Sequence, residues 1–290
     1  LCFLLWLYNL SMNLELKQFS VIGHPINHSL SPHIHLLFAK QFDLPISYER
    51  VDIKREDLLL RLAEFQAKGY KGLNVTLPLK HDAYLLCQEL SEKAQLCESV
   101  NTISIKNNKL LGDTTDGIGL IRDLANKGIS LNKARCLLVG AGGAANGVMA
   151  DLIECLPSIL YLTNRTIEKS MIMESHWKNF AKKHSVVLKV ADINGTDSYD
   201  YDVIINATSA GLSSDVSPIK SRIIKKETFC YDMTYGRKTP FMRQAIKINA
   251  KTFDGLGMLI EQAAESFRIW HNMTPHTYNI KSELQLLKLI

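Results

Sequence analysis

Short apolar runs alternate with amphipathic stretches along most of this 290-residue chain. In the first part, apolar runs at 18–23, 48–53 and 72–76 predict strands. Between these runs, apolar positions at helical spacing predict helices at 31–41 and 56–68. The first part is therefore predicted to fold in the order β-α-β-α-β.

The same alternation continues in the second part of the chain. The predicted strands are 134–139, 159–163, 186–190, 201–206 and 229–233. The first predicted helix follows the strand at 134–139 and ends at 156, and the later ones are 168–183, 240–249 and 256–270. Strands that alternate with helices favour parallel sheets, so the predicted fold class is α/β.

Composition and charge narrow the possible functions. Hydrophobic residues make up 46% and charged residues 22% of the chain, which is typical of a protein with a buried core. The net charge of +5 comes from mixed acidic and basic residues without a long basic block, so we expect no nucleic-acid partner. No interior stretch approaches the ~20 apolar residues of a membrane helix. Six scattered cysteines without a Cys-x-x-Cys pair predict a reducing, cytoplasmic setting and no metal site.

The first residues do not fit the periodic pattern. They are apolar but lack the basic region and the cleavage site of a signal peptide. Leu1 is not Met, whereas Met12 directly precedes the first periodic segment. We therefore expect residues 1–11 to be an upstream or non-native extension outside the fold.

A glycine-rich turn follows the predicted strand at 134–139. Its sequence, Gly140-Ala141-Gly142-Gly143-Ala144-Ala145, fits G-x-G-x-x-A at the start of a helix. Glycines allow the tight turn and the close approach of a pyrophosphate, and the helix N-terminus offers free N–H groups. The string alone is a weak signal, but its position between a strand and a helix predicts a dinucleotide site.

The end of the next predicted strand indicates which dinucleotide is bound. An NAD site usually has an acid there to bind the ribose hydroxyls. This chain has Asn164-Arg165-Thr166, with Lys169 one turn later. An arginine can bind a 2′-phosphate through two parallel hydrogen bonds, so NADP is favoured. The alternative is that Arg165 and Lys169 are ordinary solvated surface cations.

Three further segments carry polar residues that packing alone does not explain. Ser29 and Ser31 lie at the predicted start of the 31–41 helix, where two hydroxyls can hold a carboxylate; Ser31, followed by proline, is also expected to cap this helix. Lys80 ends the run Asn74-Val75-Thr76-Leu77-Pro78-Leu79-Lys80, beyond the carboxyl end of a strand, where ligands bind in open sheets. The run 112–117 lies at the expected domain junction, and domain interfaces are favoured places for ligand clefts. The structural alternatives are a solvated lysine and aspartates that form turns or helix caps, and for Asp113 we prefer a turn or a helix cap.

Together these segments resemble the shikimate dehydrogenase family, over nearly the whole chain from Phe19 to Trp270. The matching runs are His28-Ser29-Leu30-Ser31-Pro32, Asn74 to Lys80, Val100-Asn101-Thr102, Gly112 to Gly117, Gly140 to Ala145, Asn164-Arg165-Thr166, Asn206-Ala207-Thr208-Ser209-Ala210-Gly211, Tyr231-Asp232-Met233 and Asp254-Gly255-Leu256-Gly257-Met258. Each run is short, and the resemblance depends on their number and order.

The resemblance implies NADP-dependent reduction of 3-dehydroshikimate to shikimate, in the biosynthesis of chorismate and aromatic amino acids. By position, Lys80 and Asp116 resemble the catalytic pair, and either member of so close a pair can carry the transferred proton. The residues that resemble shikimate contacts are Ser29, Ser31, Thr76, Lys80, Asn101, Asp116, Tyr235 and Gln262. The residues that resemble cofactor contacts are Gly140, Ala141, Gly142, Gly143, Ala144, Asn164, Arg165, Thr166, Lys169, Met233, Gly255 and Glu92.

The resemblance also implies two domains with a cleft between them. We expect a substrate-binding catalytic domain over 12–115, with 256–290 packing back on it, and a Rossmann-type NADP-binding domain over 116–255. The expected partner is the small-molecule substrate, and a homodimer is compatible with the sequence.

Two positions depart from the family pattern. Thr114 stands where the family usually has Asn, and Lys169 replaces the more usual Arg. Lys169 keeps the charge but lacks the planar fork, so its hold on a 2′-phosphate is expected to be looser.

Three alternatives remain open at this point. A quinate/shikimate dehydrogenase that uses NAD is expected to have an acid where Asn164-Arg165 stand. A nucleotide-binding sensor without catalysis is expected to have lost Lys80 or Asp116, and a purely structural partner domain does not account for the dispersed polar positions.

Overall fold

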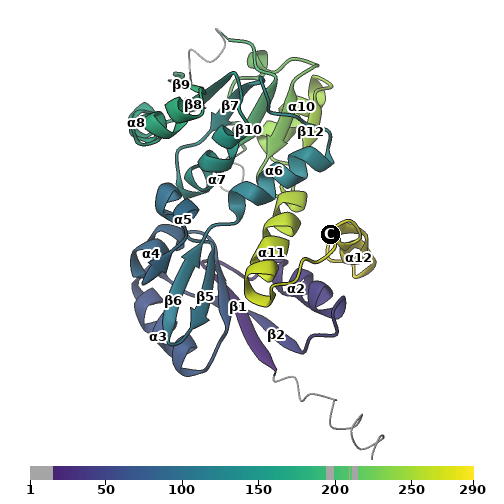
Figure 1. The fold of residues 1–290 in the computed structure, drawn as a ribbon. Coiled ribbons are helices and arrows are strands. Elements are labelled where there is room, and N and C mark those ends of the chain that lie inside the picture. The colour runs from purple at the N-terminus through teal and green to yellow at the C-terminus, as the bar shows by residue number, and fades with distance from the viewer. Residues whose placement is uncertain (1–15, 194–198, 209, 211–214) are drawn as a thin grey trace, which may run out of the picture.

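The computed structural model describes residues 16–193, 199–208, 210 and 215–290. The predicted extension at 1–11, and Ser209 and Gly211 of the Asn206 to Gly211 run, lie outside these residues. The chain forms two lobes, each built around one sheet, with helices packed on the sheets and between the lobes (Figure 1).

The first sheet combines parallel and antiparallel strands. In chain order its strands are β1 (Lys17–Gly23), β2 (Ile46–Asp52), β3 (Gly72–Val75), β4 (Glu89–Leu90), β5 (Thr102–Lys106) and β6 (Lys109–Asp113). They are arranged in space as β2-β1-β3-β5-β6-β4. Strand β1 pairs in parallel with β2 and β3, but β5 runs antiparallel to both β3 and β6.

The antiparallel part corrects the expectation of purely parallel sheets. Strands β5 and β6 are joined by Asn107 and Asn108, which have φ values of +50° and +59°. Two consecutive residues with positive φ match the twist of a tight hairpin, and Asn is among the residues that adopt this conformation. The short hairpin thus turns the chain back beside β3 without a crossover helix.

The second sheet is parallel throughout, as predicted. Its strands are β7 (Arg135–Val139), β8 (Ile159–Thr163), β9 (Val187–Val190), β10 (Val203–Asn206), β11 (Phe229–Asp232) and β12 (Lys251–Phe253). Their spatial order is β12-β11-β10-β7-β8-β9, so the chain leaves β7 first to one side and later to the other. The strand order reverses between β7 and β10, and ligands of open α/β sheets bind at such a reversal.

Helices cover the sheets and connect the lobes. They are α2 (Ser31–Lys40), α3 (Leu58–Ala67), α4 (Lys80–Leu86), α5 (Glu92–Cys97), α6 (Asp116–Asn126), α7 (Gly143–Glu154), α8 (Ile167–Lys183), α10 (Pro240–Lys247), α11 (Leu256–His271) and α12 (Ile280–Leu286), with 3-10 turns at Arg55–Asp57 and Ser221–Ile223. Helices α6 and α11 pack against each other between the lobes, and α11 and α12 also pack on α2 of the first lobe (Figure 1).

Each lobe has its own apolar core. The largest cluster lies in the second lobe, where side chains of β7 and α7 pack around the buried Trp177 of α8. In the first lobe, Leu73 and Val75 of β3 pack against Leu58 and Leu62 of α3. A separate cluster joins α2, α11 and α12 through Phe38, Phe267 and Leu284, and it ties the C-terminal helices to the first lobe.

Candidate active site

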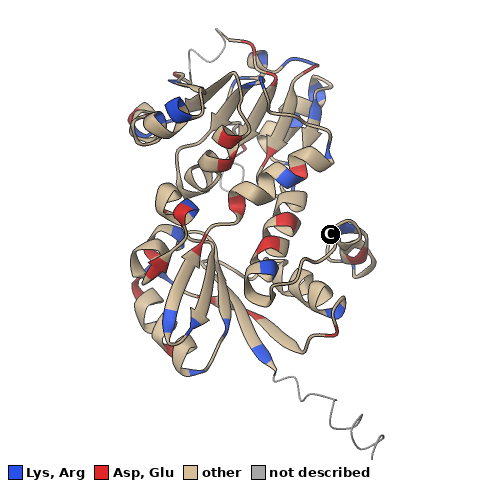
Figure 2. Ribbon diagram, viewed as in Figure 1, with Lys and Arg blue, Asp and Glu red and all other residues tan. Residues whose placement is uncertain are grey.

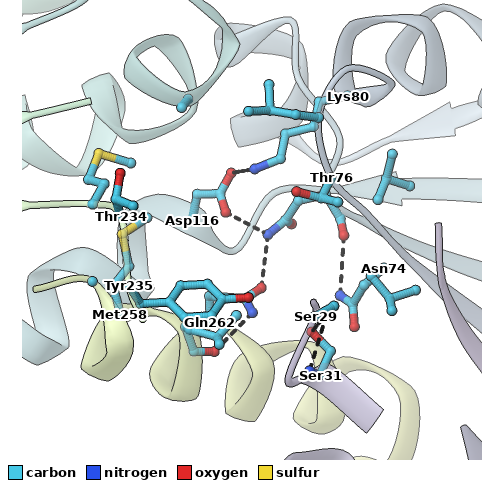
Figure 3. A pocket seen from close by; sticks show the side chains of 18 of the residues that line it. Ser29, Ser31, Asn74, Thr76, Lys80, Asp116, Thr234, Tyr235, Met258 and Gln262 are labelled. Atoms are coloured by element: carbon cyan, nitrogen blue, oxygen red, sulfur yellow. Dashed lines mark hydrogen bonds and ion pairs between the residues drawn. The ribbon is translucent and has the colours of Figure 1, made fainter. Parts of the chain in front are cut away.

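A buried ion pair lies between the lobes. The Nζ atom of Lys80 is 2.5 Å from Oδ2 of Asp116, and the two side chains are only 12% and 7% exposed (Figure 3). Lys80 is the first residue of α4, after the turn that follows β3, and Asp116 is the first residue of α6. A carboxylate at a helix N-terminus is favoured by the helix dipole. The structure therefore brings together two predicted catalytic residues that are 36 positions apart.

Asn101 holds the other oxygen of the Asp116 carboxylate. Its Nδ2 donates to Asp116 Oδ1 at 2.9 Å and to Oε1 of Gln262 at 3.1 Å. Its Oδ1 accepts the backbone N–H of Thr115 at 2.8 Å. Since each oxygen of Asp116 has a partner, the carboxylate is fixed with one edge towards Lys80.

A pair of serines and a tyrosine lie across the cavity from this ion pair (Figure 3). The Ser29 hydroxyl donates to Oγ of Ser31 at 3.2 Å, and both side chains are buried. The expectation that Ser31 caps α2 is wrong: the cap position is held by Leu30, and Ser31 is the first helical residue. The Ser31 hydroxyl makes no capping bond, because it lies one position too far into the helix, so it can contact a ligand. Burial raises the pKa of Tyr235, so its hydroxyl stays protonated and can donate.

These residues surround one cavity of about 250 Å³. All eight residues predicted to contact the substrate line it: Ser29, Ser31, Thr76, Lys80, Asn101, Asp116, Tyr235 and Gln262. Its wall combines these hydroxyl, amide and charged groups with apolar side chains such as Ile26 and Met258. A small cavity with a few converging polar groups is typical of a site for a small polar ligand.

A second cavity, of about 510 Å³, lies over the glycine-rich turn between β7 and α7. Gly140 has a φ of +115°, a conformation that L side chains rarely adopt. A Cβ atom built on Gly142 or Gly143 has no other group within 4 Å, so the space beside this turn is open. The open space faces the free N–H groups at the start of the 12-residue helix α7, and a pyrophosphate fits there.

The far end of the second cavity has the chemistry expected for a 2′-phosphate. It is lined by Asn164, Arg165, Thr166 and Lys169, which follow β8. Within the described ranges, neither Arg165 nor Lys169 forms an ion pair, and no acid directly follows β8. Two cations without an ion-pair partner in the described ranges, in a cavity that Glu168 does not line, fit the phosphate of NADP better than the bare hydroxyls of NAD.

The two cavities meet beside the ion pair. Both are lined by Leu77, Ala144, Ala207 and Thr208. Met233 and Gly255, which were predicted to contact the cofactor, line the first cavity near this junction. A dinucleotide lying along the glycine-rich turn can therefore reach the Lys80–Asp116 pair. Glu92 lines neither of the two cavities and is exposed on α5.

Sequence reasoning missed several residues of the first cavity. Thr234, Met258 and Leu259 also line it. Thr115, which orients Asn101, was not singled out although it lies inside the quoted 112–117 run. Asp113 is the last residue of strand β6 rather than part of a turn or a helix cap, and its Oδ1 accepts from the Ser91 hydroxyl and the Thr114 N–H.

Two features are absent from the part of the chain that the structure describes. No group of three or more His, Cys, Asp and Glu side chains there is arranged to hold a metal ion. None of the helices found there combines the length and apolar character that a membrane crossing requires.

The fold and the two joined cavities define a class: an oxidoreductase that uses a dinucleotide cofactor. Comparison with known proteins identifies the family. A family described as "Shikimate dehydrogenase substrate binding domain" matches residues 21–103, "Shikimate / quinate 5-dehydrogenase" matches 123–237, and "Shikimate 5'-dehydrogenase C-terminal domain" matches 255–277.

Whole-chain relatives agree with these matches. The chain is 42% identical to the NADP(+) shikimate dehydrogenase of Janthinobacterium sp. (strain Marseille), over 94% of this chain and 99% of the relative. It is 40% identical to the enzyme of the same name from Methylobacillus flagellatus, over 93% and 99%. A solved shikimate 5-dehydrogenase from Thermus thermophilus, in complex with NADP(H) and shikimate, is 30% identical over 95% of this chain and all of that chain, with a TM-score of 0.84. This chain belongs to the shikimate dehydrogenase family.

Proposed function

We propose that this protein is an NADP-dependent shikimate dehydrogenase, which reversibly reduces 3-dehydroshikimate to shikimate in the route to chorismate and the aromatic amino acids. The observation that carries the proposal is the buried Lys80–Asp116 pair at the junction of two cavities. One cavity has the size and polar groups for a small hydroxylated acid, and the other has the turn and the cations for NADP.

The substrate is held by groups on opposite sides of the first cavity. Ser29, Ser31 and Tyr235 supply hydroxyl donors for the carboxylate, beside the start of α2. Thr76, Asn101 and Gln262, with the catalytic pair, supply partners for the hydroxyl groups. The ring is thereby fixed with the reacting carbon close to Lys80 and Asp116.

The cofactor is held by the second lobe. The N–H groups of the Gly140 to Ala144 turn bind the pyrophosphate, and Asn164, Arg165, Thr166 and Lys169 bind the 2′-phosphate end. Met233 and Gly255 line the first cavity, where they would contact the reactive ring of the cofactor. Glu92 does not line either cavity, so we assign it no contact in this arrangement.

When NADPH is bound, it supplies the hydride that reduces the ketone carbon of the substrate. Negative charge then grows on the ketone oxygen, which needs a proton from a positioned acid. Lys80 donates or relays that proton, and Asp116 holds the Lys80 ammonium in place from 2.5 Å. In the reverse direction the same pair accepts the proton from the substrate hydroxyl.

A four-way assay tests this function. Purified protein is given shikimate or quinate with NADP⁺ or NAD⁺, and the reduced cofactor is followed by its absorbance. We expect shikimate with NADP⁺ to give the highest kcat/KM by at least tenfold. A preference for quinate with NAD⁺ would favour the quinate/shikimate alternative, and the absence of turnover in all four mixtures would contradict the proposal.

The same proposal includes the limits of the two domains, a cytoplasmic location and a homodimer. We assign substrate binding to 12–115 with 256–290, and cofactor binding to 116–255. The five described cysteines are free thiols, which suits the reducing cytoplasm. A homodimer is tested by light scattering of the purified protein.

A further inference from the structure

A continuous chain of buried polar side chains runs behind the first cavity. It begins at Tyr48 on β2, passes through Asn74 on β3 and Thr102 on β5, and ends at Asn101 and Asp116. All five residues are at most 7% exposed. Tyr48 and Thr102 do not line either cavity, so neither has a direct role in the function proposed above.

Each link of the chain is a hydrogen bond. The Tyr48 hydroxyl donates to Oδ1 of Asn74 at 2.6 Å, and Nδ2 of Asn74 donates to Oγ1 of Thr102 at 3.3 Å. The Thr102 hydroxyl donates to Oδ1 of Asn101 at 2.9 Å, and Nδ2 of Asn101 donates to Oδ1 of Asp116 at 2.9 Å. Every donor therefore points the same way, towards the carboxylate.

The Tyr48 hydroxyl sets this direction at one end. Burial raises the pKa of Tyr48, so the hydroxyl keeps its proton and donates. Asn74 then has its oxygen towards Tyr48 and its amide nitrogen towards Thr102. The same nitrogen also donates to the backbone carbonyl of Asn101 at 3.2 Å. Without the Tyr48 hydroxyl, the Asn74 oxygen loses this donor, and the amide is held less firmly through the bonds of its nitrogen.

Ser266 on α11 supports the middle of the chain. Its hydroxyl accepts from Nδ2 of Asn74 at 3.0 Å and lies 2.7 Å from Oγ1 of Thr102. Its hydroxyl can donate to Oγ1 of Thr102 or, at 3.1 Å, to the backbone carbonyl of Gln262. When Ser266 donates to Thr102, the Thr102 proton remains available for Asn101. Buried donors and acceptors that are all paired fix one arrangement of side chains.

We propose that Tyr48 and Thr102 are positioning residues, which act through Asn74 and Asn101 to hold Asp116 against Lys80. This inference rests on the proposed function, since it concerns the same catalytic pair. It predicts that two hydroxyl groups outside both cavities affect turnover. Their loss displaces the carboxylate at the end of the chain and leaves the cofactor cavity unchanged.

Variants that remove one hydroxyl test the inference. In Tyr48→Phe and Thr102→Val the side chain keeps its approximate shape, and we expect kcat for shikimate oxidation to fall about tenfold, in line with the loss of one buried hydrogen bond. The Kd of NADP⁺, measured by fluorescence, should change less than twofold. Thr102→Ser keeps the hydroxyl and should restore kcat to within threefold of wild type.

Matched controls separate positioning from general damage. Thr228 is also buried, and its hydroxyl bonds the Tyr201 carbonyl and the Lys225 N–H in the second lobe, so Thr228→Val loses a comparable group away from the chain. Tyr70→Phe removes a hydroxyl that bonds Glu49 at the surface. Both controls should keep kcat within twofold of wild type, whatever their melting temperatures.

The kcat values of these variants support or overturn the inference. A kcat within twofold of wild type in Tyr48→Phe and Thr102→Val would overturn the inference. Equal losses in Thr102→Ser and Thr102→Val would also overturn it, because shape rather than the hydroxyl would then matter. If one variant fails to fold, the kcat of the other variant decides. If neither variant folds, the hydrogen-bonded side chains serve the fold rather than the site, and the inference fails. The proposed function fails separately, if the wild-type protein does not oxidise shikimate with NADP⁺.

Discussion

At the scale of single residues, the site depends on charged side chains, of which some form an ion pair and others have no ion-pair partner. Lys80 and Asp116 form a buried ion pair. Arg165 and Lys169 instead line an open cavity and have no carboxylate partner in the described structure. The motif residues were predictable because each belongs to a short run with its own chemistry. Ser266 behind them carries no local signal, and Thr102 lies in a quoted run but was given no role; the part that each plays is recognised only by its contacts.

Arg165 should determine the choice of cofactor. Arg165→Ala removes a charge-assisted hydrogen bond worth roughly 1.5–3 kcal/mol, so NADP⁺ should bind about ten- to a hundredfold more weakly. The affinity for NAD⁺, which lacks the 2′-phosphate, should change less than twofold. Titration of cofactor fluorescence with each dinucleotide measures both values. An equal weakening of the two would show that Arg165 does not contact the 2′-phosphate.

His35 should make the fold sensitive to acid. It is buried and stacked on Tyr48, with ring centroids 4.4 Å apart, and burial lowers the pKa of its imidazole from 6.5 to about 3. Between these two values the unfolded chain binds the proton more strongly, so stability falls as the pH falls below about 6.5. This residue alone should lower the free energy of unfolding by about 2 kcal/mol between pH 7 and pH 5.

Urea unfolding of the wild type and His35→Phe at pH 7 and pH 5 measures this effect. Phe cannot take up a proton, so the variant should lose about 2 kcal/mol less stability than the wild type over this interval. The same loss in both proteins would show that His35 does not cause the acid sensitivity.

At the scale of elements, helix α7 connects the two halves of the site. It begins in the glycine-rich turn, and its residue Gly147 lies against the Asp116 carboxylate: a Cβ atom there would be 3.2 Å from Oδ2. The helix proposed to bind the pyrophosphate at its start therefore also contacts Asp116 of the proposed catalytic pair. The long regular elements around it were predicted within a few residues, and 159–163 matches β8.

Most of the missed elements, other than the 11-residue helix α6, are short and depend on tertiary contacts. Strand β4 has two residues, and helices α4 and α5 have seven and six. Such short segments have little hydrophobic periodicity of their own, and their structure depends on packing. The hairpin between β5 and β6 had a signal in Asn107-Asn108, and its omission led to the wrong expectation of a parallel first sheet.

Gly147→Ala should reduce activity without weakening the fold. The added methyl group must displace Asp116 by a few tenths of an ångström, so kcat should fall roughly tenfold, the range seen when a reacting group is slightly misplaced. Alanine favours the helix by about 0.5–1 kcal/mol over glycine, which offsets the crowding. Steady-state kinetics and a thermal melt measure the two effects. A wild-type kcat would show that Asp116 tolerates the contact, and a large drop in melting temperature would show that the crowding is not local.

At the scale of the whole molecule, two lobes each supply half of one site. The first lobe contributes the serines, Lys80 and Asn101, the second contributes the glycine-rich turn and its cations, and Asp116 lies at the start of the connecting helix α6 (Figure 1). Acidic and basic residues alternate along the ribbon of both lobes (Figure 2). The site is therefore defined by a few buried charges between the lobes rather than by the overall charge.

Lys80 is expected to act in the chemical step and not mainly in binding. The measurement is kcat for shikimate oxidation by Lys80→Ala, with the Kd of shikimate and of NADP⁺ measured by calorimetry, and with Lys71→Ala, an exposed lysine of the same lobe, as the control. We predict a fall in kcat of roughly 10²–10⁴-fold, as expected for a lost general acid. The KM for shikimate and both Kd values should change little, and Lys71→Ala should match the wild type. A Lys80→Ala variant with near-normal kcat would contradict the account.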